Sequence, residues 1–91
     1  MNASKRQEEI QLRLEKAFKP ELLVVEDEGH LHAGHEGAKD GRGHFRVHIV
    51  SAAFNDLNMI ARHRAIYQQM GTLMETDIHA LAIEAFASNE I

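Results

Sequence analysis

The sequence contains no cysteine, and this absence limits the chemistry of any site that the chain can build. Without thiols the chain forms no disulfide and offers no thiolate to a metal, so a soft metal centre would need sulfur ligands from a partner. Tryptophan is also absent, and there is only one proline among the 91 residues. No run of about 18 apolar residues is present, so the sequence predicts no transmembrane helix.

Basic residues are not in excess either. The 10 Lys and Arg residues are outnumbered by 14 Asp and Glu residues, and the net charge of −4 argues against a protein that coats nucleic acid or acidic membranes. The first residues carry charges of both signs and no apolar signal segment, so we expect a cytoplasmic protein. A length of 91 residues with 44% hydrophobic content predicts one folded domain, residues 1–91.

Hydrophobic spacing predicts a helix followed by two strands. Ser4 and Gln7 form a capping-box pattern, and apolar residues then recur at helical spacing up to Pro20. The short β-branched run Leu22–Glu26 is typical of a strand. In His44–Val50 apolar and polar residues alternate, which predicts a strand with one buried face. The two strands should form an antiparallel hairpin.

The second half of the chain predicts helix and then strand. Asn55 and Asp56 are suited to begin a helical stretch that runs to about Glu75. The periodicity leaves open whether a short turn near 57–61 divides this stretch into two helices. The segment Ile78–Phe86 is predicted to be a strand, although its alanines also allow a helix. This order of elements predicts an α+β fold with helices on one face of a three-stranded sheet.

The segment Glu28–Gly43, between the first two strands, is the candidate site. It carries His30, His32 and His35 within six residues, together with most of the six glycines of the chain. Imidazole is the commonest metal ligand and titrates near neutral pH, and the segment is longer than ordinary hairpin loops. The residues alone therefore predict a metal site, and they leave open a mononuclear zinc, copper or nickel centre.

The other histidines have simpler structural interpretations. His63 falls on the apolar face of a predicted helix, where we expect it to be packed and hydrogen-bonded. His44 and His48 are predicted to be surface residues of a strand. His79 precedes an apolar strand, a position at which a single histidine is more often structural than a metal ligand.

Arginines suggest a competing function in nucleic-acid binding. Arg46, Arg62 and Arg64 are the candidate contacts, with Lys39 and Arg42 as further members of the patch, and phosphate contacts of this kind give a steep salt dependence. Solvated surface charge explains the same residues more simply. The sequence does not predict an enzyme, because it shows no nucleophile and base pattern and no glycine-rich phosphate loop.

Taken together, several segments resemble the BolA family over essentially the whole chain. An Asp27-Glu28 pair opens the histidine-bearing loop. The segments that carry the resemblance follow it: His44–Val47 continuing into Ile49–Ser51, then Arg62–Tyr67, and then Ile78–Ile83. The resemblance implies an α-β-β-α-α-β fold similar to type II KH domains. It also implies that the last segment is a strand.

The resemblance further implies a function. Family members pair with monothiol glutaredoxins, as an apo complex or around a 2Fe–2S cluster shared with glutathione, in iron sensing and iron–sulfur cluster trafficking. The implied ligands in this chain are His79 and one loop histidine, for which His32 matches best, followed by His35 and then His30. Two imidazoles can replace two thiolates on one iron, as Rieske centres show, so a chain without cysteine suits this role.

The family also supplies the alternative function and the oligomeric expectation. Some members are described as transcriptional regulators, so DNA binding through the KH-like surface is the second candidate. The chain has no Gly-x-x-Gly phosphate clamp in the KH position, between its two predicted helices of residues 55–75. In isolation we expect a monomer or a weak homodimer.

Overall fold

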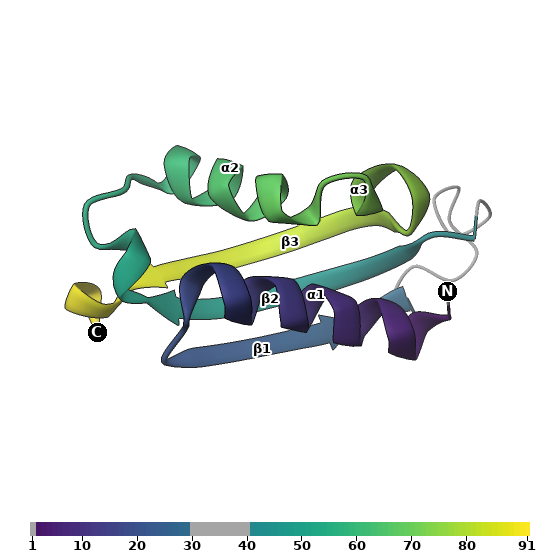
Figure 1. Ribbon diagram of the computed structural model, residues 1–91, viewed down its shortest axis with the longest axis horizontal. Coiled ribbons are helices and arrows are strands. Elements are labelled where there is room, and N and C mark those ends of the chain that lie inside the picture. The colour runs from purple at the N-terminus through teal and green to yellow at the C-terminus, as the bar shows by residue number, and fades with distance from the viewer. Residues whose placement is uncertain (1, 30–40) are drawn as a thin grey trace.

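The computed structural model describes residues 2–29 and 41–91, in which helices pack along a three-stranded sheet (Figure 1). Its helices and strands occur in the predicted order α-β-β-α-α-β, which is confirmed. The elements are α1 (Ala3–Phe18), β1 (Leu22–Asp27), β2 (Gly43–Ser51), the 3₁₀ turn η3 (Ala52–Phe54), α2 (Met59–Met70), α3 (Leu73–Thr76), β3 (Ile78–Ala87) and the 3₁₀ turn η4 (Ser88–Glu90).

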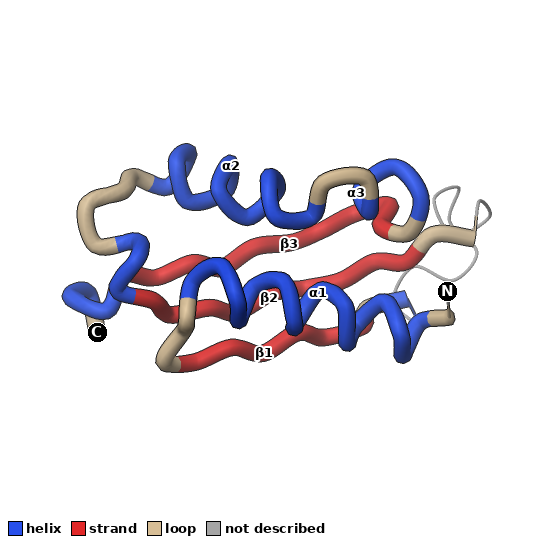
Figure 2. The backbone as a smooth tube through the Cα atoms, viewed as in Figure 1, coloured by secondary structure: helices blue, strands red, loops and turns tan. Residues whose placement is uncertain are grey.

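The sheet has the order β1-β2-β3, with β2 in the centre. β1 pairs with β2 in antiparallel register, so that Val25 lies opposite Val47. β3 runs parallel to β2, with Leu81 opposite Phe45. A parallel pair needs a crossover, and the α2–α3 region supplies it (Figure 2). The starts of β2 and β3 and the end of β1 therefore lie at one end of the sheet (Figure 1).

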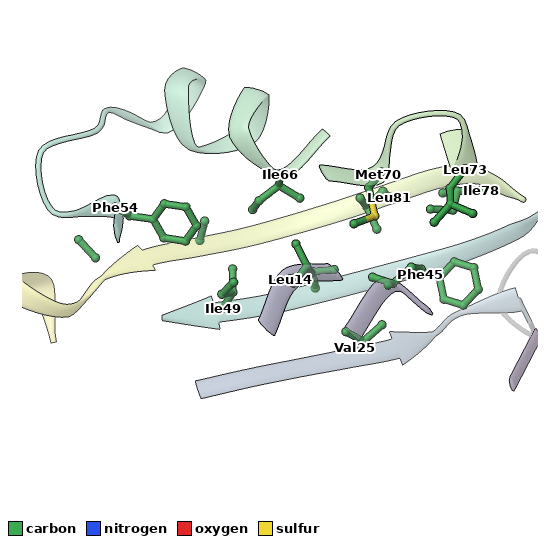
Figure 3. Close-up of a cluster of buried hydrophobic side chains, with 14 residues drawn as sticks. Leu14, Val25, Phe45, Ile49, Phe54, Ile66, Met70, Leu73, Ile78 and Leu81 are labelled. Carbon is green, nitrogen blue, oxygen red and sulfur yellow. The ribbon is translucent and has the colours of Figure 1, made fainter. Parts of the chain in front are cut away.

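The core lies between the sheet and the helices (Figure 3). Alternate residues of β2, namely Phe45, Val47 and Ile49, are almost completely buried, as their period of two predicted. They pack with apolar side chains of the helices and of β3. This cluster comprises Ile10, Leu14, Val25, Phe45, Val47, Ile49, Phe54, Ile66, Met70, Leu73, Ile78, Leu81, Ala85 and Ala87.

The predicted capping box at the start of α1 is wrong. The cap is Asn2, whose Oδ1 accepts a hydrogen bond of 2.8 Å from the Lys5 backbone N–H, and Ser4 lies inside the helix. Asparagine is at least as good an N-cap as serine, so the earlier residue begins the helix. Gln7 instead donates its side-chain amide to the Val25 carbonyl over 2.6 Å and ties α1 to β1.

The predicted start of the second helical region is also wrong. The turn η3 occupies the expected start, and the N-cap of α2 is Asn58, whose Oδ1 accepts a 2.9 Å hydrogen bond from the Ala61 N–H. The division into two helices occurs at Gly71, where a φ of +53° suits glycine. Within residues 2–29 and 41–91, no helix has the length and apolarity that a membrane crossing requires.

Candidate functional site

His79 lies at a β-bulge near the start of β3. Gly43 pairs with Ile78 and His44 pairs with Ala80, so His79 is the extra residue between these two pairs. A bulge redirects a side chain relative to the regular alternation of the strand, and the side chain of His79 is exposed. The structure therefore presents this imidazole at the end of the sheet, outside the core.

The described ends of the histidine-rich segment are fixed beside His79. The Gly43 N–H donates to the Asp77 carbonyl over 2.9 Å, and the Glu28 N–H donates to the His44 carbonyl over 2.8 Å. Both ends of the segment 28–43 are thus hydrogen-bonded to the end of the sheet that carries His79. The candidate ligands His30, His32 and His35 themselves lie outside the described residues.

Among the described residues, Arg42 and His44 contact the His79 ring. Nη2 of Arg42 lies 3.1 Å from its Nδ1, and Nη1 of the same guanidinium donates to the Met74 carbonyl of α3 over 3.3 Å. The His44 ring is tilted by 49° against the His79 ring, with 5.1 Å between their centroids. The prediction that His44 is a surface residue is wrong, because its side chain is buried next to His79.

The described residues supply His79 as an exposed donor but no complete metal site. In the ranges 2–29 and 41–91, no three or more His, Asp or Glu side chains are grouped so that they could hold a metal ion. A metal centre at His79 would therefore take further ligands from the rest of the chain or from a partner. A neutral imidazole fits such a centre as a nitrogen ligand.

Charged groups on the sheet face opposite the helices form a network. Arg46 contacts Glu28 and Glu84, each over 2.9 Å, and the hydrogen bond to Glu28 is the main cause that raises the pKa of Arg46. His48 lies 2.8 Å from Glu84 through Nδ1 and 3.2 Å from Glu26 through Nε2. The positive charge of Arg46, one of the candidate nucleic-acid contacts, is therefore balanced by carboxylates within the protein.

Arg62 is not the solvated surface residue that the sequence predicted. It is only 6% exposed, and its guanidinium donates to the carbonyl of Leu57 over 2.9 Å and to that of Ala85 over 3.1 Å. It also contacts Glu90 at 2.7 Å. A buried guanidinium requires such partners, and they leave Arg62 little capacity to contact a phosphate. Arg64, two residues later, is exposed.

His63 is partly buried on α2. The prediction that it is hydrogen-bonded is wrong for Nε2, which is buried and makes no hydrogen bond within the described part of the chain.

Arg42 and His44 are the neighbours of His79 that sequence reasoning missed. Their approach depends on the register of β2 against β3 and on the bulge, and neither has a local sequence signal.

Comparison with known proteins gives consistent results. The family model described as BolA-like protein matches residues 14–90. A Sinorhizobium protein, described as an uncharacterized protein in the cobS 5′ region, is 45% identical over 85 residues, which are 91% of this chain and 91% of that protein. The DNA-binding transcriptional regulator BolA of Haemophilus influenzae is 37% identical over 84 residues, covering 92% of this chain and 79% of that one.

The solved structures agree with this fold. The BolA domain of SufE1 from Arabidopsis thaliana superposes with a TM-score of 0.83 and 34% sequence identity, covering 100% of this chain and 99% of that one. The similarity thus extends over the whole arrangement of helices and strands. It includes the start of β3, where His79 lies.

Proposed function

Because the chain belongs to the BolA family, we propose that it is an adaptor that pairs with a monothiol glutaredoxin and supplies histidine ligands to a shared 2Fe–2S cluster. The glutaredoxin and its bound glutathione would supply the thiol ligands. The biological role would be iron–sulfur cluster trafficking or iron sensing in the cytoplasm. The proposal assigns the chain no catalytic activity of its own.

The observation that supports this proposal is the placement of His79. Its imidazole is exposed at a bulge, and the segment that carries the other candidate histidines begins and ends at the same end of the sheet. The chain contains no cysteine, so nitrogen is the donor that it can offer to an iron centre in place of thiolate sulfur. A second protein is then needed to complete the ligand set.

In this role the chain would present two imidazoles, His79 and one from the loop. His32 is the first choice for the loop ligand and His35 is the alternative, both as the family resemblance implies. The cluster, when bound, would supply redox-active iron whose potential is raised by nitrogen ligation. Each ligating nitrogen must be free of its proton, so protonation of the imidazoles would oppose binding.

The test combines the purified chain with an iron–sulfur-loaded monothiol glutaredoxin and glutathione. We expect His79→Ala to leave the far-ultraviolet circular dichroism unchanged, since the side chain is exposed, and to alter the visible absorption and dichroism of the cluster. His48→Ala, which removes a histidine of the charged network, is the matched control and should leave the cluster spectrum as in wild type. An unchanged spectrum in His79→Ala would reject His79 as a ligand.

The same spectra distinguish the loop candidates. If His32 is the second ligand, His32→Ala changes the cluster spectrum and His35→Ala leaves it unchanged. The reverse result would assign His35, as the alternative states. A spectrum that is unchanged in both variants would reject both residues.

DNA binding is the second candidate function, because the Haemophilus influenzae relative is named a DNA-binding transcriptional regulator. Of the three candidate arginines, Arg62 is buried and Arg46 is paired with two glutamates, whereas Arg64 is exposed. A gel-shift assay with a salt titration tests this function. Each phosphate contact adds about 0.9 to the slope of log affinity against log salt, so Arg64→Ala should reduce the slope by about 1. Absence of any sequence preference at moderate salt would count against a regulator.

A further inference from the structure

We propose that Arg42 is a positioning residue that sets the tautomer of His79 and must release that ring before it can bind a metal. The contact that carries this inference is the 3.1 Å approach of Arg42 Nη2 to His79 Nδ1. The tautomer is a property of the chain alone. The consequence for metal binding rests on the proposed function.

The direction of the hydrogen bond follows from the chemistry of the two groups. A guanidinium has five N–H donors and no acceptor, and it remains protonated at all relevant pH values. Nδ1 of His79 must therefore be the acceptor in this contact. A neutral imidazole carries one N–H, so the proton lies on Nε2.

The position of Arg42 is fixed by its surroundings. Its Nη1 donates to the Met74 carbonyl, and Gly43, the next residue, is hydrogen-bonded to the Asp77 carbonyl. The guanidinium is therefore held between α3 and the start of β3. The His79 ring lies next to the partly buried guanidinium of Arg42 and the buried ring of His44. These two contacts give the imidazole a defined orientation.

Metal ligation by either nitrogen of His79 would break this contact. A metal needs a nitrogen lone pair, and at Nδ1 that lone pair is the one that accepts from Arg42. At Nε2 the lone pair becomes available when the proton moves to Nδ1, and a protonated Nδ1 cannot accept a hydrogen bond from a guanidinium. Arg42 therefore competes with any metal at His79, whichever nitrogen binds.

The first test measures the tautomer in the metal-free protein. Long-range ¹H–¹⁵N correlation spectra at about pH 8, where most imidazoles are neutral, distinguish Nδ1–H from Nε2–H. We expect the Nε2–H form for His79 in wild type and in the control Arg64→Ala, and an increased Nδ1–H population in Arg42→Ala. An Nδ1–H ring in wild type, or the same tautomer ratio in Arg42→Ala, would overturn the inference.

The second test measures competition directly, with Co²⁺ as the probe and visible absorption as the signal. Loss of one charge-assisted hydrogen bond predicts about tenfold tighter Co²⁺ binding by Arg42→Ala, equivalent to about 1.4 kcal/mol. Arg64→Ala removes the same charge from an exposed helix position and should change the affinity far less. Equal affinities for wild type and Arg42→Ala would overturn the inference. A gain that persists when His79 is also replaced by alanine would overturn it as well.

The two proposals fail in distinguishable ways. If the cluster spectrum with glutaredoxin is unchanged in His79→Ala, the proposed function loses its ligand. The tautomer assignment would then still stand, since it is measured in the metal-free chain. If His79 is Nδ1–H in wild type, or if its tautomer ratio is unchanged in Arg42→Ala, the inference about Arg42 is rejected. The cluster experiment then still tests whether His79 is a ligand.

Discussion

Nη1 of Arg62 lies 3.1 Å from the carbonyl oxygen of Ala85 and joins helix α2 to strand β3. The same nitrogen contacts Glu90 in the C-terminal 3₁₀ turn, and Nε donates to the Leu57 carbonyl before α2. Three separate parts of the chain thus meet at one buried guanidinium. Its role in the fold is structural.

Arg62→Ala should lower the free energy of unfolding by about 2–4 kcal/mol, because it leaves the Ala85 and Leu57 carbonyls without this donor in a largely buried place. Urea denaturation followed by circular dichroism measures the change. Arg64→Ala, at an exposed position on the same helix, should stay within about 0.5 kcal/mol of wild type. Similar losses in both variants would contradict the structural role of Arg62.

The pH dependence of stability should include a contribution from Glu90. Hydrogen bonds from the Ala87 N–H and then from Arg62 hold the pKa of Glu90 below its ordinary value of 4.5. A carboxyl with a lowered pKa in the folded state stabilises the fold above its unfolded pKa, and this stabilisation is lost as the pH falls through the folded pKa.

Glu90→Gln should therefore lose less stability than wild type as the pH is lowered from about 6 to about 3. Urea midpoints measured across that range provide the comparison. Asp77, whose pKa is lowered by the Thr76 hydroxyl and by Arg6, should maintain part of the acid sensitivity in the variant. Parallel pH profiles for wild type and Glu90→Gln would contradict the prediction.

Gly43→Ala should destabilise the start of β2. A Cβ at this position would lie 2.5 Å from Cε2 and 2.9 Å from Cζ of Phe45, and this ring is 1% exposed in the core. Such overpacking costs about 1–3 kcal/mol of unfolding free energy. A double-mutant cycle with Phe45→Leu checks the cause, since the smaller side chain should relieve the clash. Strictly additive effects in that cycle would exclude a clash with Phe45 as the cause.

Ser51→Ala should also lower stability, by about 1–3 kcal/mol. The buried hydroxyl donates to the Phe18 carbonyl over 2.6 Å and accepts from the Ala53 N–H over 3.0 Å. Removal would therefore leave two backbone groups without this partner, at the end of α1 and the start of η3. Thermal denaturation compared with Ser4→Ala, an exposed position within α1, provides the measurement. A loss no larger than that of Ser4→Ala would contradict the prediction.

β1 and β2 could be predicted closely because a β-branched run and an alternation of apolar and polar residues are local properties of the sequence. For β3 the alanines also allowed a helix, and the family resemblance implied the strand. The predicted His44–Val50 became Gly43–Ser51, and Leu22–Glu26 became Leu22–Asp27. The helix starts could not, because neighbouring residues compete as caps and nothing local decides between them. In α1 the N-cap is Asn2, and the predicted cap Ser4 lies within the helix.

The site was predicted less completely, for a physical reason. His79 was identified through family resemblance, and the structure shows its exposure, but its contacts with Arg42 and His44 arise from the register of two strands that are distant in sequence. The burial of Arg62 was missed because arginine is rarely buried, and its partners come from three different segments.

The bulge at His79 gives this position a freedom that the rest of β3 lacks. Residue 79 is the extra residue between two pairs of the β2–β3 register, and its side chain is exposed, so neither a strand pair nor the hydrophobic core dictates its identity. A substitution there would change the contacts with Arg42 and His44 and leave the core packing in place. A different donor, such as a thiol or a carboxylate, would fit there with the architecture preserved. Evolution or protein engineering can thus change the coordination chemistry at this end of the sheet separately from the fold.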